Sequence, residues 1–291
     1  MSSALGFSPA ASGRAAYAGT MNLSVGRSGD RSRPVRTESA GVLRLMKPLH
    51  LDDSGQVAYF VVNPGGAYFS EACRMDVEVL PGASLLLSSQ GATRIYRTPR
   101  GPAVQEAAFT VGEGARLEYV PDQLIAYRDA DYRQVTTITM AAGAQVFVEE
   151  IVTPGWDPDG TPFTYTGMLL RLEVRHADGG LVCADNVRIV PGDIGAAIDG
   201  IGYLEGSSHM GNVLILGQHV DEAYVDAVRE LVDASGLARA GVTSGARHGI
   251  PWVMVRALAS STDVLSALVL SVNEHDRSVT TGQRRLNLRR Y

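Results

Sequence analysis

A unit of two apolar runs joined by a Gly-Ala turn recurs three times in the middle of the chain. The copies occupy residues 75–90, 107–122 and 136–151 and read MDVEVLPGASLLLSSQ, AAFTVGEGARLEYVPD and TTITMAAGAQVFVEEI. In each copy the first run alternates apolar and polar residues, as a half-buried strand does. A strand-turn-strand unit cannot bury its apolar face alone. The repeat therefore predicts stacked, β-helix-like (solenoid-like) layers in which equivalent positions form columns.

The remaining apolar patterns predict further strands and, in the C-terminal third, two helices. Strand-like runs cover residues 42–46, 56–62, 163–174, 181–190 and 252–258. Apolar residues from Val220 to Val232 recur at helical spacing, and Ser260 to Thr262 can cap a second helix. The apolar face expected for that second helix comprises Val264, Leu265, Leu268 and Val272. The predicted fold is therefore mainly β, with stacked β layers and two α-helices.

The first 37 residues lack a comparable pattern. Residues 1–36 are rich in Ser, Ala, Gly and Arg and contain five Arg and one Asp. We predict a disordered Arg/Ser-rich leader over residues 1–37 and a single β domain over residues 38–291. The leader has no apolar stretch typical of a secretory signal. It loosely resembles a transit peptide, but an extension upstream of a start near Met21 is the favoured interpretation.

The charge is unevenly distributed along the chain. The whole chain carries −5, whereas residues 1–36 and the tail from Arg284 to Tyr291 each carry +4, so the body between them carries −13. An acidic body disfavours nucleic acid as the main partner and suits cations or basic proteins. Aromatic residues beside arginine, at 94–97 and 127–128, could stack on bases, but alternating strand packing is the commoner reason for such a pattern. No apolar run is long enough to span a bilayer, and we predict a cytoplasmic protein without a membrane partner.

Sequence signatures of catalysis are scarce. The chain contains no GxxxxGK[ST], HExxH, CxxC or GxSxG motif. Its six histidines are scattered, and we interpret them as surface or loop residues. Cys73 and Cys183 lack the spacing of a metal site, and we predict two free thiols, with a disulfide between them left open.

The repeat places oxygen-bearing side chains where the second strand of each unit ends. These residues are Ser88, Ser89, Gln90, Asp122, Glu149 and Glu150. Stacked in columns, their hydroxyl, amide and carboxylate oxygens would suit a hydrated or weakly bound divalent cation. The competing interpretation is that they satisfy backbone groups at strand ends and turns, as such residues often do. Because neighbouring residues of a strand point to opposite sides, at most one of Glu149 and Glu150 can face inward.

Several stretches together resemble one known family. They are SSQGATRIYR at 88–97, ARLEYVPDQLIAYRDADYRQ at 115–134, VFVEE at 146–150, VRALA at 255–259 and the terminal Arg-Tyr pair. Their order and spacing are similar to those of the urease accessory protein UreD family, also called UreH, over residues 38–291. The chain departs from the family pattern at 72–76 and at 153–161.

The resemblance implies a non-enzymatic scaffold with a β-helix-like build. Members of the family bind apo-urease and the partner UreF, which recruits the GTPase UreG, and the assembly delivers nickel to urease. By this resemblance the six oxygen-bearing residues become candidates for the lining of a nickel passage, and other acidic residues such as Asp185 could contribute. The ion would be in transit, with no tightly bound cofactor.

A hypothesis from another class stays open. The chain could be a β-solenoid or β-sandwich module that binds protein or carbohydrate and has no role with metal. That function requires an exposed aromatic or polar face outside the column of oxygen donors. A metal-dependent hydrolase is a more distant possibility, because no triad of ligands is visible in the sequence.

Overall fold

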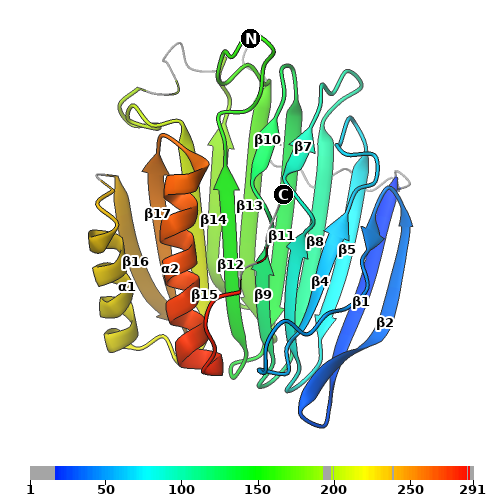
Figure 1. Cartoon of the computed structure of the whole chain (residues 1–291), viewed down its shortest axis with the longest axis vertical. Helices are drawn as coiled ribbons and strands as arrows, with labels where there is room; N and C mark the ends of the chain where they lie inside the picture. The colour runs from blue at the N-terminus through cyan, green and yellow to red at the C-terminus, as the bar shows by residue number, and fades with distance from the viewer. Residues whose placement is uncertain (1–16, 193–197, 199, 238, 287, 289–291) are drawn as a thin grey trace.

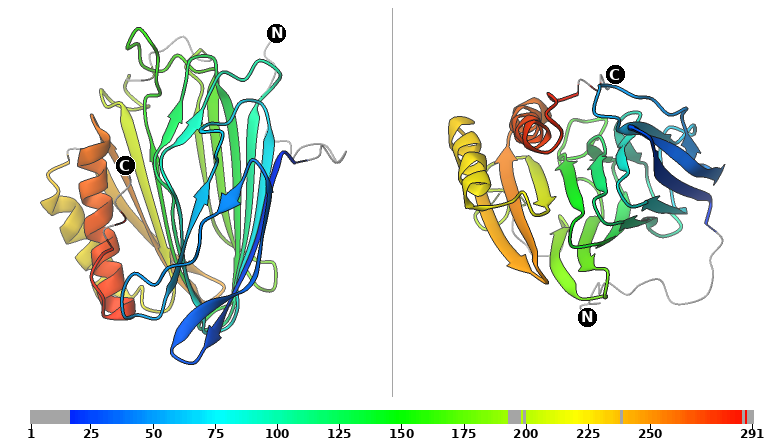
Figure 2. Two further views of the ribbon diagram at one scale, coloured as in Figure 1. Left: turned by 45° about the vertical axis from the view of Figure 1, so that its right-hand side comes forward. Right: turned by 90° about the horizontal axis from the view of Figure 1, so that it is seen from below.

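Two facing β-sheets and two helices make up the fold in the computed structural model, which describes residues 17–192, 198, 200–237, 239–286 and 288. The helices lie over the outer face of one sheet (Figures 1 and 2). The seven-stranded sheet has the order β14 (Leu181–Ile189), β13 (Gly167–His176), β11 (Asp131–Met140), β8 (Ala103–Val111), β5 (Ala72–Val79), β1 (Gly19–Ser28), β2 (Arg31–Gly41).

The ten-stranded sheet lies between the first sheet and the helices. Its main path is β16 (Ala240–Arg247), β17 (Ile250–Ala259), β15 (His209–Leu216), β12 (Gln145–Val152), β9 (Arg116–Val120), β6 (Ser84–Ser89), β4 (Val57–Val62), β3 (Arg44–Leu45). Two short strands, β7 (Thr93–Ile95) and β10 (Leu124–Ala126), pair with each other beside this path. They carry the chain back toward the seven-stranded sheet.

The three sequence repeats form successive turns of a β-solenoid. In each repeat the first strand (β5, β8, β11) joins the seven-stranded sheet and the second (β6, β9, β12) joins the ten-stranded sheet, with parallel pairing between turns. The turn alanines Ala83, Ala115 and Ala144 are all buried, and the residues that follow them pair in register. The predicted mainly β, solenoid-like fold with columns of equivalent positions is confirmed.

The prediction of a disordered leader is wrong for the residues that the structure describes. Gly19–Ser28 and Arg31–Gly41 form an antiparallel hairpin, and β1 pairs in parallel with β5. Met21, Leu23 and Val25 are buried between the sheets. The hairpin is difficult to predict from the sequence because β2 is an exposed edge strand with polar residues. Edge pairing also tolerates a proline at the register shift in this hairpin. Residues 1–16 lie outside the described residues.

Alternation along the strands creates two apolar layers. One lies between the sheets and the other between the ten-stranded sheet and the helices. On β12, for example, Val146 and Val148 face the other sheet, whereas Phe147 and Ile151 face the helices. A strand that is buried on both faces in this way can place chemistry on either side of the sheet.

Both predicted helices are present. α1 (Glu222–Ala234) is capped by Asp221, whose side chain accepts from the Tyr224 N–H. α2 (Thr262–Thr281) is capped by Ser261 and ends at Gly282, which adopts the left-handed conformation. Leu265, Leu268 and Val272 are buried as expected, but Val264 is half exposed because it lies in the first turn, on the solvent side.

Two remaining expectations concern thiols and membranes. Cys73 and Cys183 are both free, as predicted. Burial raises the pKa of each thiol to about 12, so both are unreactive at neutral pH. Neither helix in the described ranges is long and apolar enough to cross a membrane.

Candidate functional site

A row of polar side chains crosses the otherwise apolar space between the two sheets. The inward positions of β8 are Ala103, Gln105, Ala107, Phe109 and Val111, so Gln105 interrupts an apolar series. On β11, Gln134 and Thr136 interrupt the inward series, and Gln134 pairs in register with Gln105. We use the name polar row for Ser89, Gln105, Gln134, Glu150, Asp185, Asn212 and Arg256.

Strand register aligns the members of the polar row along the stack of turns. In the ten-stranded sheet Glu150 pairs with Asn212, and Asn212 pairs with Arg256. In the seven-stranded sheet Asp185 pairs with Leu172 on β13, one strand beyond β11. The row therefore runs across neighbouring strands, parallel to the solenoid axis, from β6 to β17.

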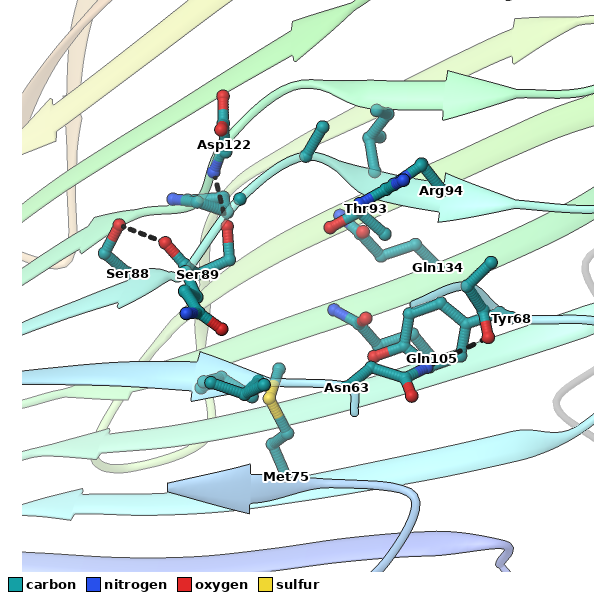
Figure 3. Close-up of a pocket in the computed structure, with 18 of the residues that line it drawn as sticks. Asn63, Tyr68, Met75, Ser88, Ser89, Thr93, Arg94, Gln105, Asp122 and Gln134 are labelled. Carbon is teal, nitrogen blue, oxygen red and sulfur yellow. Dashed lines mark hydrogen bonds between the residues drawn. The ribbon is translucent and has the colours of Figure 1, made fainter. Parts of the chain in front are cut away.

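Two cavities follow this row. The larger has a volume of about 310 Å³ and the smaller about 30 Å³. Tyr119, Gln134 and Glu150 line both cavities and stand between them. Figure 3 shows Ser88, Ser89 and Asp122 grouped at one side of the larger cavity and Gln105 and Gln134 at the other.

Glu150 is the central carboxylate of the row. Gln134 Nε2 donates to Glu150 Oε1 at 2.7 Å and so links the two sheets, while Tyr132 Oη donates to Gln134 Oε1 at 3.1 Å. Burial raises the pKa of Glu150 to about 7 against the hydrogen bond from Gln134, which favours the ionised form. The nearby carboxylate of Asp185 adds to the rise. Glu150 therefore exchanges its proton near neutral pH.

Asp185, Asn212 and Arg256 form the far end of the row. Arg256 Nη2 contacts both carboxylate oxygens of Asp185, at 2.6 and 2.7 Å, and Arg256 Nε donates to Asn212 Oδ1 at 2.9 Å. The ion pair joins β17 to β14 and thus one sheet to the other. Asn212 Nδ2 and the nearby Thr136 Oγ1 are buried without a protein hydrogen-bond partner.

Four of the predicted column residues lie at the β6 end of the row, and two of these, Ser88 and Ser89, also make hydrogen bonds to backbone groups. Ser88 Oγ donates to the Val120 carbonyl at 2.7 Å, and Ser89 Oγ accepts from the Asp122 N–H at 2.8 Å. These contacts are those of the competing interpretation, although both serines also line the larger cavity. Gln90 is exposed and Asp122 half-buried at the same end.

The two glutamates at the end of β12 separate as expected. Glu149 shares a face with Phe147 and Ile151, which pack beneath the helices, while Glu150 points between the sheets. Glu149 borders the smaller cavity, but alternation places its side chain on the opposite face of the sheet. Of the two, Glu150 is the carboxylate directed along the cavities.

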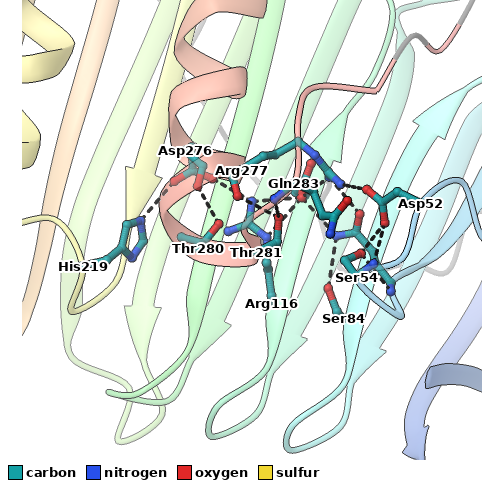
Figure 4. A network of polar contacts seen from close by, with 12 residues as sticks. Asp52, Ser54, Ser84, Arg116, His219, Asp276, Arg277, Thr280, Thr281 and Gln283 are labelled. Atoms are coloured by element: carbon teal, nitrogen blue, oxygen red, sulfur yellow. Dashed lines mark hydrogen bonds and ion pairs between the residues drawn. The ribbon is translucent and has the colours of Figure 1, made fainter. Parts of the chain in front are cut away.

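A second buried polar cluster lies on the other face of the same sheet, under α2 (Figure 4). We call Asp52, Gln56, Arg116, Glu118, Asp276 and Arg277 the charged network. Glu118 Oε1 accepts from Arg277 Nη1 at 2.6 Å, from Arg116 Nη2 at 2.9 Å and from Gln56 Nε2 at 3.1 Å. Arg277, which is 0% exposed, also pairs with Asp52. The cluster fastens α2 to β9 and to the loop before β4.

Asp276 closes the network toward α1. Its carboxylate accepts from Arg116 Nη2 at 2.7 Å and from Tyr224 Oη at 2.8 Å, and it lies 3.0 Å from His219 Nε2. Burial by itself would raise the pKa of Asp276, but the charge of Arg116 holds it well below the ordinary value. His219 lies in the loop before α1, as predicted, although its ring is nearly buried.

Sequence reasoning missed most of the polar row. Gln105 and Gln134 carry a signal that can be read: an amide at an inward position of an alternating strand. Asn212 and Arg256 carry none, because their strands enter the row only through tertiary pairing. Within the part of the chain that the structure describes, no three His, Cys, Asp or Glu side chains gather as a metal site. The row offers mainly weak oxygen and amide donors.

Comparisons with known proteins agree with one another. A family model described as "UreD urease accessory protein" matches residues 17–290. This span includes the β1–β2 hairpin. "Urease accessory protein UreD" of Actinomyces naeslundii is 44% identical over 274 residues, covering 94% of this chain and 98% of the relative. The proteins of the same name from Kocuria rhizophila and Arthrobacter sp. are 38% and 40% identical, covering 97% and 94% of this chain and 92% and 94% of the relatives.

Proposed function

Since the chain belongs to the UreD family of urease accessory proteins, we propose that it acts in urease maturation as a non-catalytic scaffold. In this proposal it binds apo-urease and a UreF-like accessory protein in the cytoplasm. A UreG-like GTPase joins through the complex and supplies the nucleotide chemistry, for which this chain has no P-loop. Nickel(II) is the cargo of the assembly.

The observation that supports a route for the ion is the polar row with its two cavities. An apolar interior would exclude a hydrated divalent cation, because removing its water without replacement costs far more than a fold can offset. The row replaces that water with hydroxyl, amide and carboxylate oxygens from Ser89 to Asp185. In the smaller cavity the unpartnered Thr136 Oγ1 is an oxygen that could contact an ion, whereas the unpartnered Asn212 Nδ2 is a donor that could bind only one of the ion's water molecules.

Weak donors suit transit better than storage. Tight nickel sites in proteins draw on imidazole or thiolate ligands held at fixed geometry. Along the described row the donors are mainly oxygen atoms that succeed one another across the strands. Each can hold an ion briefly, and none would keep it from moving to the next.

Glu150 is the step at which protons and nickel compete. With a pKa of about 7 the carboxyl is partly protonated at neutral pH, and an arriving divalent cation displaces the proton. At lower pH a larger fraction of Glu150 is protonated, so nickel transfer through the passage is expected to slow as the pH falls below 7. Its position between the two cavities makes this carboxyl the residue on which the proposal most depends.

The test compares Glu150→Gln with Glu149→Gln, a matched change one residue away on the opposite face of β12. Each variant is produced with apo-urease, the UreF-like protein and the UreG-like GTPase, and urease nickel content is measured beside complex formation. Glu150→Gln is expected to lower nickel incorporation several-fold while the complex still forms, and Glu149→Gln to change it little. Equal nickel content in both variants and wild type would remove Glu150 from the route.

A further inference from the structure

A column of aromatic rings runs along the outside of the solenoid, on the side formed by β7 and β10. Phe69, Tyr96, Tyr127 and Trp156 come from successive turns, and their ring centroids are 5.2, 4.6 and 4.9 Å apart. We call these four residues the aromatic ladder. The turns are held in register by main-chain bonds from the N–H groups of Tyr96, Tyr127 and Trp156, at 2.7, 2.8 and 2.9 Å.

The ladder is accessible at both ends. Phe69 is 44% exposed and Trp156 is 50% exposed, whereas Tyr96 and Tyr127 are half-buried between them. Large apolar side chains gathered on a surface mark interaction sites more often than scattered ones do. The rings pack against one another in edge-on or tilted arrangements, so the surface is restrained and would lose little entropy on binding.

Arginines surround the ladder, and three of them carry uncompensated charge. Arg94, Arg97 and Arg100 are exposed, and no acidic side chain pairs with any of them among the described residues. Arg100 lies beside the Phe69 end, where its N–H donates to Ser70 Oγ. At the opposite end Arg128 is already neutralised by Asp157 and Asp159, each at 2.5 Å. At the Phe69 end the Glu71 carboxylate accepts from the Phe69 and Ser70 N–H groups, so the free positive charge lies mainly beside Tyr96, at Arg94 and Arg97.

The ladder also adjoins the larger cavity. Tyr68, Thr93 and Arg94 line that cavity and are neighbours in sequence of the ladder residues Phe69 and Tyr96 (Figure 3). A protein that covers the ladder would thus lie against one end of the polar row.

We propose that the aromatic ladder is the docking surface for a partner protein that presents carboxylates around an apolar side chain. The rings supply the apolar contact, and Arg94, Arg97 and Arg100 supply the charge that selects an acidic partner. The body of this chain is acidic overall, so a basic patch here stands out as a site of opposite sign. The arginine-rich ends of this chain have the wrong charge to occupy it. The proposal rests on the scaffold function above, because the partners available to test it are those of urease maturation.

The experiment measures binding of purified apo-urease and of the UreF-like protein, each separately, to the full chain. Trp156→Ala and the double change Arg94→Glu with Arg97→Glu are compared with matched surface changes far from the ladder, Val35→Ala and Arg247→Glu. Melting temperatures confirm that each variant is folded. One of the two proteins is expected to bind about tenfold or more weakly to both ladder variants. The charge reversal is expected to slow association and to remove much of its salt dependence, while the two control variants bind as wild type does.

Three outcomes would overturn the proposal in different ways. If wild type binds its partners and the ladder variants bind them equally well, the ladder is not the docking surface, and the scaffold function stands. If wild type binds neither protein, the scaffold function fails and the ladder proposal fails with it. Binding of an oligosaccharide or single-stranded DNA that quenches Trp156 fluorescence, without any effect of the ladder variants on protein partners, would replace the acidic protein with another class of ligand.

Discussion

The polar row and the charged network lie on opposite faces of the same sheet, and they bury polar groups in contrasting ways. Glu118 and Tyr119 are adjacent on β9, yet Glu118 belongs to the network beneath α2 and Tyr119 lines the cavities between the sheets. The network is compact, and its opposite charges are in direct contact. The row borders two cavities and contains a carboxyl with a raised pKa. Buried polar atoms without a hydrogen-bond partner occur in both, for example Glu118 Oε2 in the network and Asn212 Nδ2 in the row.

This contrast supports a structural role for the charged network and agrees with the functional role proposed for the polar row. Buried charges that compensate one another hold elements in place, and removing one partner leaves the other uncompensated. A buried carboxylate with space beside it is instead poised to exchange a proton or an ion. The difference also appears in the directions of two pKa shifts, which are lowered for Asp276 and raised for Glu150.

Breaking the charged network should have the largest effect. Arg277→Met leaves Glu118 and Asp52 without their shared partner and is expected to lower the free energy of unfolding by about 3–5 kcal/mol. Chemical denaturation monitored by circular dichroism measures the change. Arg285→Met, which removes only an exposed arginine 3.9 Å from Glu274, serves as the control and should cost less than about 1 kcal/mol. Equal costs for the two variants would contradict a structural role for the network.

Removing the charge of Asp276 should destabilise the protein somewhat less and change its response to acid. The folded-state pKa of Asp276 lies below its unfolded value, so its stabilising contribution is present above the unfolded pKa and is lost as pH falls through the folded pKa. Asp276→Asn is expected to cost about 2–4 kcal/mol at pH 7 and to flatten the loss of stability below about pH 4. Unfolding free energies measured from pH 7 to pH 3 test this; an unchanged acid slope would contradict it.

Glu150→Gln should raise the free energy of unfolding near and above neutral pH, whereas Asp276→Asn lowers it. Because the folded-state pKa is raised to about 7, wild type loses stability as pH rises from the unfolded pKa toward 7, since folding then holds a proton that the unfolded chain releases. Glutamine mimics the protonated form. The variant is expected to match wild type at pH 4 and to be more stable by about 1–3 kcal/mol above pH 7. Thermal unfolding at pH 4.5 and pH 8 measures the difference, and a variant that is less stable at pH 8 would place Glu150 in a compensated ion pair.

The smallest expected effect is a change in the pKa of Glu150 caused by Asp185→Asn, at the β14 end of the row. Its charge contributes to the raised pKa of Glu150, and its loss also leaves the positive charge of Arg256 nearby. Both changes favour ionised Glu150, so the pKa of Glu150 should fall from about 7. Carboxyl carbon chemical shifts followed against pH by nuclear magnetic resonance report it. A pKa that stays constant or rises would show that Asp185 and Glu150 are not electrostatically coupled.

The sequence predicted the repeating body of the fold better than its margins. Three similar units, each with a Gly-Ala turn between two apolar runs, predict stacked layers because each unit repeats the same alternation. The edge strands β2 and β16 gave no such sign, since exposed edge strands with Gly, Ser and Arg need no apolar pattern to pair. β1 does alternate, with Met21, Leu23 and Val25 facing inward, but the short alternation was overlooked within the Ser/Arg-rich segment. Val264 was assigned to the buried face of α2 by spacing alone, and its place in the first turn left it half exposed.

The repeat named candidate residues for an ion passage because they recur at equivalent positions. Five of them, Ser88, Ser89, Gln90, Asp122 and Glu150, line the larger cavity in the structure. Their role as a nickel route stays a prediction. Asp185 was named only as a further acidic residue, and Arg256 was not found at all. The pairing of these two residues depends on the approach of β14 and β17, whose positions no local pattern specifies.

The sequence by itself determined the repeat, the alternation along the repeat strands, the two helices with the cap of the second, and membership of one family. These features depend on residues close together in the chain, where periodicity and turn chemistry act. Only the tertiary structure decided which face of β12 carries each glutamate and that Glu118 is a structural anchor. It also joined distant residues into the polar row and four rings into the aromatic ladder. The physical reason is that burial, shifted pKa values and ion pairing arise from residues that meet in space, and the distance between them along the chain leaves no pattern to read.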